Sequence, residues 1–461
     1  MITPAYLVIT QAEQTKMIAI NNKKGFDLKI SGKPSGALEP LLEPSHVAVL
    51  PAKIPFIKPR LKVQVGTRVK VGTPLFEDKR NPDIRFLAPG GGEVAHIDFG
   101  PRRIIREIVI RLDADEEHET FDRLGPSEIA SADREDLVKA LMAGGLWPFF
   151  RALPFRDIAD PGRTPPALFV CLDTLEPFHP RAEIFLKGQI ELFRLGLEIL
   201  KRLSPHVYVT AAQANEPLKA QLNGEISHTF KGAYPAHDPG VLLYRIKKAP
   251  EENAAWFIHG QDVLHLARFF TLGQYPIERI VTLGGSAVST GKHLRTRAGV
   301  PLAHLVGEVE INDPARFILG GIFTGCLGHP DSYMGFYENA LNVIPAPQDP
   351  EAFAFARPGT GKLSYSKTFL SSLRQTTLNG DCNMHGEKRA CVNCGYCAEV
   401  CPVDMLPQFT LKCLLADEIE EALAHGLLDC VQCGLCTYVC PSKIELAETL
   451  VKFKASYYKE R

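Results

Sequence analysis

Hydrophobic and polar positions alternate in short runs between His46 and Leu112. Gly and Pro separate the runs, which are HVAVL, LKVQV, TPLFE, EVAHI and REIVIRL. Alternation with a period of two, interrupted by turn residues, is typical of the short strands of a small sandwich or barrel. The pattern therefore predicts a compact β unit over residues 46–115.

Two stretches of this unit, VGTRVKVGTPLFED and APGGGEVAHI, resemble the two halves of a biotinyl/lipoyl-like β-sandwich. Domains of that kind can carry a modified lysine, and Lys79 is the candidate here. Its surroundings, EDKRNPD, are an ordinary polar turn, which favours a scaffold role over modification.

The period changes after the acidic run DADEEHE, which indicates a solvated linker. Apolar residues recur at helical spacing in REDLVKALMAGG, and GLWPFFRALPF follows as a packed loop, so residues 116–165 are expected to form a helical linker. From Pro166 the strand ALFVCLD, the long amphipathic helix AEIFLKGQIELFRLGLEILKRL and the strand HVYVTAA alternate. This order predicts a parallel, Rossmann-like α/β domain over residues 166–273, with Cys171 as inert core.

The segments IERIVTLGGSAV and LRTRAGVPLAHLV predict strands around a Gly-Gly turn, in a small β-grasp-like unit over residues 274–345. A connecting segment, 346–390, follows. No GxGxxG motif follows a strand, so no dinucleotide site is indicated. Neither GGSAVSTGKH nor PGTGKLS has the spacing of a phosphate loop, which argues against ATP or GTP hydrolysis.

Composition narrows the class of protein. A chain of 461 residues is expected to form three or four domains, and its net charge of −1 gives no support to nucleic-acid binding. No apolar run reaches the length of a membrane helix, and the start of the chain lacks the features of a signal peptide. A cytoplasmic protein is expected, whose association with a membrane would come through partners.

Eight of the twelve cysteines lie in two matching runs, CVNCGYCAEVCP from Cys391 and CVQCGLCTYVCP from Cys430, separated by 27 residues. The pattern CxxCxxCxxxCP is typical of bacterial ferredoxins, in which each run holds a [4Fe–4S] cluster and the fourth cysteine binds the other cluster. The expected ligands of the first cluster are Cys391, Cys394, Cys397 and Cys440. Those of the second are Cys430, Cys433, Cys436 and Cys401.

Two other uses of these cysteines are weaker. Structural zinc sites also use CxxC pairs, but the third cysteine, the spacing of the fourth and the trailing proline are ferredoxin-like in both runs. A disulfide framework does not suit a large chain without a secretion signal. Between the runs, Ile419, Ala422 and Leu423 predict a helix that Gly426 ends, and Cys413 is expected in the core.

The stretches KKGFDLKISGKPS, LFEDKRNP, GLWPFFRALPF, VTLGGSAV and DCNMHGEKR occur in this order along the chain. With the sandwich and the cysteine runs they resemble the NqrA family, the A subunits of Na⁺-translocating NADH:quinone reductases, from about Met17 to the end. NqrA is similar to RnfC of the ferredoxin:NAD⁺ oxidoreductase complex, and more distantly to the NADH-binding subunit of respiratory complex I. The resemblance implies an N-terminal extension and family segment over residues 1–45, an SLBB domain for the β-grasp unit, and a helical two-cluster domain over residues 391–461.

The chain departs from that family in its tail. NqrA proteins typically lack most cluster cysteines, whereas both sets are intact here, as in RnfC. The glycine-rich loop with which RnfC-like proteins bind flavin and NADH is absent, and GLWPFFRALPF stands in its place, as in NqrA.

The resemblance implies a peripheral subunit on the inner face of the cell membrane, held by partner subunits of an Nqr- or Rnf-type complex. Two [4Fe–4S] clusters would pass electrons, flavins are expected in the partners, quinone is a further candidate ligand, and the enzyme activity belongs to the complex. No residue is nominated as catalytic. Two alternatives stay open: an RnfC-like electron-input subunit, or else a structural docking subunit in which the clusters only staple the tail.

Overall fold

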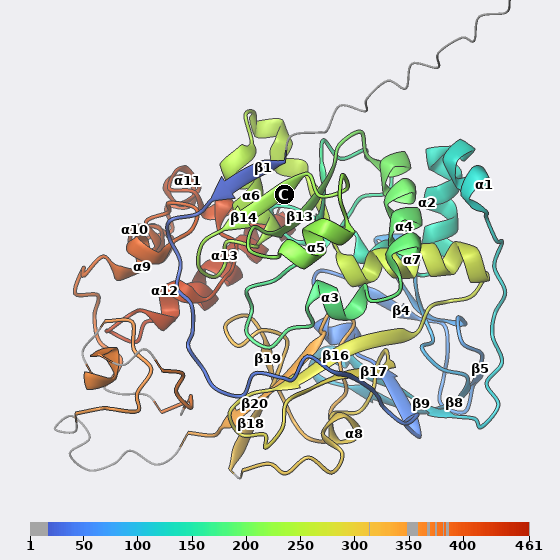
Figure 1. Cartoon of the computed structure of the whole chain (residues 1–461), viewed down its shortest axis with the longest axis horizontal. Coiled ribbons are helices and arrows are strands. Elements are labelled where there is room, and N and C mark those ends of the chain that lie inside the picture. Colours follow the sequence, from blue (N-terminus) through green and yellow to red (C-terminus); the bar gives the residue numbers. More distant parts are fainter. Residues whose placement is uncertain are drawn as a thin grey trace, which may run out of the picture.

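The computed structural model describes residues 17–312, 314–347, 358–366, 369–373, 376–380, 382–383 and 387–460. They form four β-sheets and a group of C-terminal helices, which lie together at one end of the molecule in Figure 1. The extension expected before Met17 lies outside the described residues.

Seven short strands after residue 45 form the predicted β unit, in two sheets. Both sheets are built of antiparallel pairs, and their buried apolar side chains belong to a core that continues into the α/β unit. The four-stranded sheet, in spatial order, is β3 (His46–Val49), β9 (Ile105–Leu112), β8 (Gly92–Phe99) and β5 (Arg68–Val69). The three-stranded sheet is β4 (Pro59–Leu61), β6 (Pro74–Asp78) and β7 (Asn81–Leu87). Lys79 is exposed in the turn between β6 and β7.

A seven-stranded sheet forms the centre of the α/β unit. Its first five strands pair in parallel, and the last two pair antiparallel at one edge. In spatial order they are β1 (Ile18–Asn21), β14 (His228–Lys231), β13 (Val207–Ala212), β12 (Leu168–Cys171), β15 (Trp256–His259), β10 (Arg151–Ala152) and β11 (Asp157–Ile158). The strand β1 comes from the segment before the sandwich and pairs with β14, more than 200 residues later.

Helices cover this sheet. They are α1 (Pro126–Ser131), α2 (Arg134–Ala143), α3 (Ala182–Phe185), α4 (Ile190–Leu203), α5 (Glu216–Gln221), α6 (Pro239–Ile246) and α7 (Gly260–Leu272). The single long helix expected from residue 182 to residue 203 is wrong, because the chain leaves the helix between α3 and α4. Gly188 adopts a φ of +73° there, a left-handed conformation that ends helices and that glycine tolerates best.

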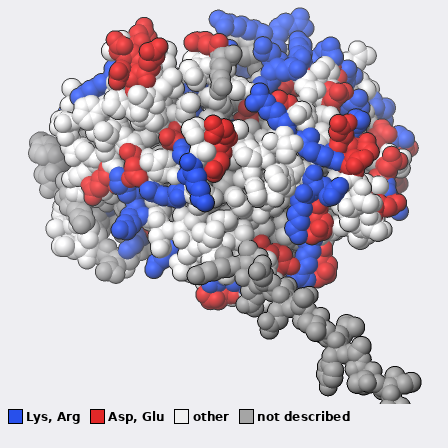
Figure 2. All heavy atoms as spheres, turned by 90° about the horizontal axis from the view of Figure 1, so that it is seen from above, with Lys and Arg blue, Asp and Glu red and all other residues white. Residues whose placement is uncertain are grey.

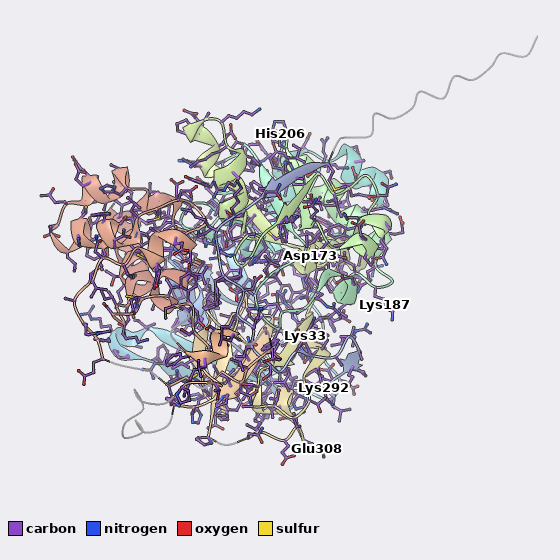
Figure 3. All side chains as sticks on the ribbon, turned by 60° about the vertical axis from the view of Figure 1, so that its left-hand side comes forward. Lys33, Asp173, Lys187, His206, Lys292 and Glu308 are labelled. Carbon is purple, nitrogen blue, oxygen red and sulfur yellow. The ribbon has the colours of Figure 1, made fainter. Side chains whose placement is uncertain are left out.

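The third unit is a six-stranded mixed sheet. In spatial order its strands are β19 (Cys326–Gly328), β18 (Ala315–Leu319), β20 (Ala340–Pro345), β16 (Glu278–Gly284), β17 (Lys292–Arg297) and β2 (Leu38–Pro40), and it carries the helix α8 (Leu302–Val306). Figure 3 marks its position: His206 precedes β13 and Asp173 follows β12, and the six-stranded sheet with Lys292 lies beyond Asp173. The sheet therefore packs at the carboxyl ends of the parallel strands.

Helices form most of the described part of the tail. They are α9 (Tyr396–Val400), α10 (Pro407–Leu415), α11 (Ile419–Ala424), α12 (Leu435–Tyr438) and α13 (Leu446–Glu460). The helix predicted between the cysteine runs is α11, and Gly426 follows it with a φ of +88°. Cys413 is half-buried against a small apolar cluster, as expected.

One face of the molecule is coloured by charge in Figure 2. In Figure 2 basic and acidic side chains both occur over a face that is mostly uncharged. Among the described residues, none of the helices has both the length and the apolar character needed to cross a membrane.

The aromatic stretch GLWPFFRALPF joins the sandwich to the α/β unit. Trp147 is fully buried, its indole Nε1 donates to the carbonyl oxygen of Ala159 at 2.8 Å, and its ring lies edge-on to Trp256. Phe149 stacks on Phe336, which comes from the six-stranded unit, with 4.9 Å between ring centroids. The stretch therefore packs between the sandwich, the α/β unit and the six-stranded unit.

Replacing Trp147 by Ala is expected to destabilise the protein by about 3–5 kcal/mol, because it empties a large closed site in the shared core. The shift of the urea midpoint, followed by circular dichroism, measures this loss. Trp147→Phe is the matched control: it keeps most of the ring but leaves the Ala159 carbonyl without a donor, so a smaller loss of about 1–3 kcal/mol is expected. Equal urea midpoints for wild type and Trp147→Ala would contradict the packing role of Trp147.

Candidate iron–sulfur site

The two cysteine runs have the same backbone conformation. Asn393 and Gln432, each between the first two cysteines of its run, have φ values of +54° and +59°. Gly395 and Gly434, one residue after the second cysteine, have φ values of +83° and +78° and begin α9 and α12. Left-handed residues at matched positions make each run curl into a tight loop.

The repeat extends past the fourth cysteine of each run. Asp404 follows Cys401 by three residues and Lys443 follows Cys440 by three, and both have a φ of +56°. The two cysteine runs therefore repeat each other in backbone conformation as well as in sequence.

One cavity in the tail lies between the first run and the end of the second. The cysteines that line it are Cys391, Cys394, Cys397 and Cys440. Three come from the first run, and the fourth is the last cysteine of the second run.

A second cavity lies between the second run and the end of the first. The cysteines that line it are Cys430, Cys433, Cys436 and Cys401, together with Cys397, which borders both cavities. Each cavity thus brings together the four cysteines that the sequence pattern grouped.

The four cysteines of each set line the wall of a cavity and are not gathered around one point. Within the described part of the chain, no three His, Cys, Asp or Glu side chains come together as the ligands of a single ion would.

Backbone amides point at several of the sulfurs. The N–H groups of Val403 and Met405 donate towards Cys401, and the N–H of Leu435 donates towards Cys433. Such donors stabilise sulfur ligands that carry negative charge. They are present because the chain turns tightly around each cavity.

Burial keeps the inner thiols protonated in the protein without iron. It raises the pKa of Cys401 to about 11 and raises the pKa values of Cys397, Cys433 and Cys436, while the nearby amides lower those of Cys401 and Cys433 by less. Positive iron would displace these protons, because a thiol that binds a metal does so as a thiolate. The donor set therefore fits an iron–sulfur core.

Solvent reaches the two cavities unequally. Cys391 and Cys394 are exposed, whereas Cys397 and Cys401 are buried and Cys430, Cys433, Cys436 and Cys440 are half-buried. The second run is the more enclosed because it packs against the α/β unit.

Ion pairs and hydrogen bonds join the tail to the α/β unit. Arg245 on α6 pairs with Asp404 at 2.9 Å and donates to the Pro402 carbonyl at 2.7 Å. Lys247 pairs with Asp429 at 2.6 Å, immediately before the second run. These contacts bracket both ends of the spacer and fix the tail in position.

Two polar side chains that sequence reasoning missed approach the second run. The Tyr234 hydroxyl lies 2.9 Å from both the Cys433 carbonyl oxygen and Glu176 Oε1, and burial raises the pKa of Glu176 to about 7. Lys454 on α13 donates from Nζ to the Cys430 carbonyl oxygen at 2.7 Å. Lys454 follows the buried Leu446 and Leu450 at intervals of four residues, so a lysine on an apolar stripe was the available signal.

Comparison with protein families supports this assignment of the tail. Residues 390–444 match a 4Fe-4S dicluster domain. A β unit, an α/β unit and this tail define a modular iron–sulfur protein. Residues 20–113 match the NqrA N-terminal barrel-sandwich hybrid domain, and residues 132–275 match the NqrA second alpha/beta domain.

Several whole proteins are similar to the chain. The A subunit of the Na(+)-translocating NADH-quinone reductase of Vibrio vulnificus strain YJ016 is 33% identical over 413 residues, which are 89% of this chain and 92% of that protein. Its counterpart from Actinobacillus pleuropneumoniae serotype 5b is 32% identical over 415 residues, with the same shares. The chain belongs to the NqrA family, as the motifs in its sequence predicted.

Among solved structures, the chain resembles an NAD⁺-reducing [NiFe]-hydrogenase in the air-oxidised state. The TM-score is 0.34 and the identity 13%, over 50% of this chain and 52% of that one. A likeness this weak carries no argument.

The unequal exposure of the thiols predicts their order of alkylation by iodoacetamide in protein freed of iron. Cys391 and Cys394 are expected to react well before Cys401, because a buried thiol with a pKa of about 11 offers little thiolate. Peptide mass spectrometry at successive times measures the order. The exposed Cys326 and the buried Cys171 serve as the fast and slow references, and equal rates at Cys391 and Cys401 would contradict the prediction.

Proposed function

We propose that this protein is a peripheral electron-transfer subunit of a membrane-bound, ion-translocating NADH:quinone oxidoreductase, and that it relays electrons through two [4Fe–4S] clusters. The observation that carries the proposal is the pair of cavities in the tail, each lined by a complete set of four cysteines. Clusters bound there would each take up and release one electron at a time.

The ligand assignment follows the two cavities. Cys391, Cys394, Cys397 and Cys440 would hold the first cluster, and Cys430, Cys433, Cys436 and Cys401 the second. Support comes from the amides directed at Cys401 and Cys433 and from the matched loops of the two runs. The third cysteine of the first run, Cys397, borders both cavities, which favours a short path between the clusters.

The remainder of the proposal rests on the relatives, which are named as the A subunits of Na(+)-translocating NADH-quinone reductases. By analogy the chain would be one component of such a complex, attached to the inner face of the membrane through its partners. The partners would supply flavins and the ion pathway, and the enzyme activity would belong to the assembly. Quinone is a candidate ligand of the complex.

The chain is divided into domains in the same proposal. We propose a Rossmann-like domain over residues 166–273, an SLBB β-grasp domain over residues 274–345 and an RnfC-like two-cluster module from residue 391. The three parallel pairings among β14, β13, β12 and β15 favour the first of these. The mixed sheet that carries α8 favours the second.

A second candidate function is structural, with the clusters as staples of a docking subunit. The contacts that hold the tail favour it, since Arg245–Asp404 and Lys247–Asp429 both depend on the fold of the cysteine runs. Both candidates need the clusters, but only the first needs their electrons.

The iron content tests the proposal directly. Protein purified without oxygen is expected to contain about eight irons and eight acid-labile sulfides per chain, because two four-iron clusters require them. After reduction with dithionite, electron paramagnetic resonance is expected to show two interacting reduced clusters. Zinc in place of iron would overturn the electron-transfer function.

Replacing Cys394 by Ser distinguishes the electron-transfer function from the structural one. Loss of one ligand of the first cluster is expected to abolish NADH-driven quinone reduction by the assembled complex, because the relay is broken. Gel filtration of the complex and its turnover are measured on the same sample. Cys326→Ser, an exposed cysteine away from both cavities, is the matched control. Full turnover by an assembled Cys394→Ser complex would favour the structural function of the clusters.

A further inference from the structure

Lys454 is a buried lysine on the face of α13 that packs into the tail. It is 2% exposed, and it continues the buried stripe of Leu446 and Leu450. Its neighbour Lys452 is exposed and pairs with Glu448 on the outer face of the helix. Only one of these two lysines is therefore enclosed.

The buried ammonium group of Lys454 binds two backbone carbonyls of the segment that leads into the second run. Its Nζ donates to Leu428 at 3.0 Å and to Cys430 at 2.7 Å. Among the described residues, no carboxylate forms an ion pair with it. Its hydrogen-bond acceptors are thus two backbone carbonyl groups, which carry no net negative charge.

The nearby carboxylates already have partners. Asp429 pairs with Lys247 at 2.6 Å, and Asp238 pairs with Arg156 at 2.7 Å. Arg156 also donates to the Val431 carbonyl at 3.1 Å, on the same loop of the second run. The surroundings therefore do not neutralise the charge of Lys454.

An enclosed charge without a counter-ion is costly, so a neighbouring anion is expected. A [4Fe–4S] cluster held by four thiolates has a net negative charge, since the thiolates outweigh the charge of the core. Each added electron makes it more negative, and an enclosed site with few solvent dipoles opposes that change.

We propose that Lys454 is the counter-charge of the second cluster and raises its reduction potential. The inference rests on the proposed two-cluster function. Lys454 binds the carbonyl oxygen of Cys430, not the cluster, so it is not a ligand and acts through its charge. Its ammonium group stabilises the reduced cluster more than the oxidised one, because the reduced cluster is the more negative.

The first cavity has a different environment. The Cys397 thiol lies 3.0 Å from Gln408 Oε1, a neutral amide, and Arg389 donates at 3.3 Å to the Pro441 carbonyl from an exposed position. Within the described hydrogen bonds, no buried lysine reaches this cavity. Only the second cluster should respond to changes at Lys454.

The test is a redox titration of the full-length protein, loaded with iron and sulfide and followed by electron paramagnetic resonance. In Lys454→Met one of the two one-electron steps is expected to move to lower potential, with about a tenfold smaller reduced fraction at a fixed applied potential, equivalent to about 59 mV. The other step should not move. Lys452→Met, on the exposed face of the same helix, is the matched control and should leave both steps unchanged.

Two further variants separate charge from hydrogen bonding. Lys454→Gln can still donate to the carbonyls but is neutral, so its potential should fall as in Lys454→Met, whereas Lys454→Arg should stay close to wild type. A wild-type potential in fully loaded Lys454→Met or Lys454→Gln overturns the proposal.

Iron analysis covers variants that fail to bind the second cluster. Retention of about eight irons by Lys454→Arg with about four in both neutral variants supports the counter-charge role. Loss of the second cluster from all three variants overturns it. Wild-type protein with no second cluster would instead refute the proposed function, a result visible before any variant is made.

Discussion

Each cavity in the tail is lined by three cysteines of one run and by the fourth cysteine of the other run, with Cys397 bordering both, and the remaining features of the tail depend on this exchange. Neither cavity is complete within one run, so the two runs must fold together. The spacer between the runs, which contains α10 and α11, has to bring the second run back beside the first. Pro402 and Pro441 help, because proline ends the helical turn after each fourth cysteine.

The exchange also explains why the two cavities differ. The first run is exposed at Cys391 and Cys394, whereas the second run faces the α/β unit and accepts hydrogen bonds from Arg156 and Lys454 on successive residues. Solvent exposure, hydrogen bonding and nearby charge are the main influences of a protein on cluster potential. A duplicated sequence thus provides two different electrostatic environments, because its surroundings are not duplicated.

Local patterns predicted what depends on local geometry. The spacing of the cysteines gave both sets that line the cavities, and periodicity gave the α/β order and most strands of the sandwich. It missed the break near Gly188, because the flanking apolar residues continue the helical period. It also missed the pairing of β1 with β14, since contacts between distant segments have no local signature. Lys454 and Tyr234 were missed because burial by another unit decides their roles.

The aromatic stretch GLWPFFRALPF is fixed by its packing, which explains why it does not serve as a phosphate-binding loop. A loop that binds phosphate offers free backbone amides and small residues. Here Trp147 is fully buried, and its one polar hydrogen already has the Ala159 carbonyl as partner. Phe149 is fixed against Phe336. The stretch joins three units through their shared core, so its sequence is constrained by packing.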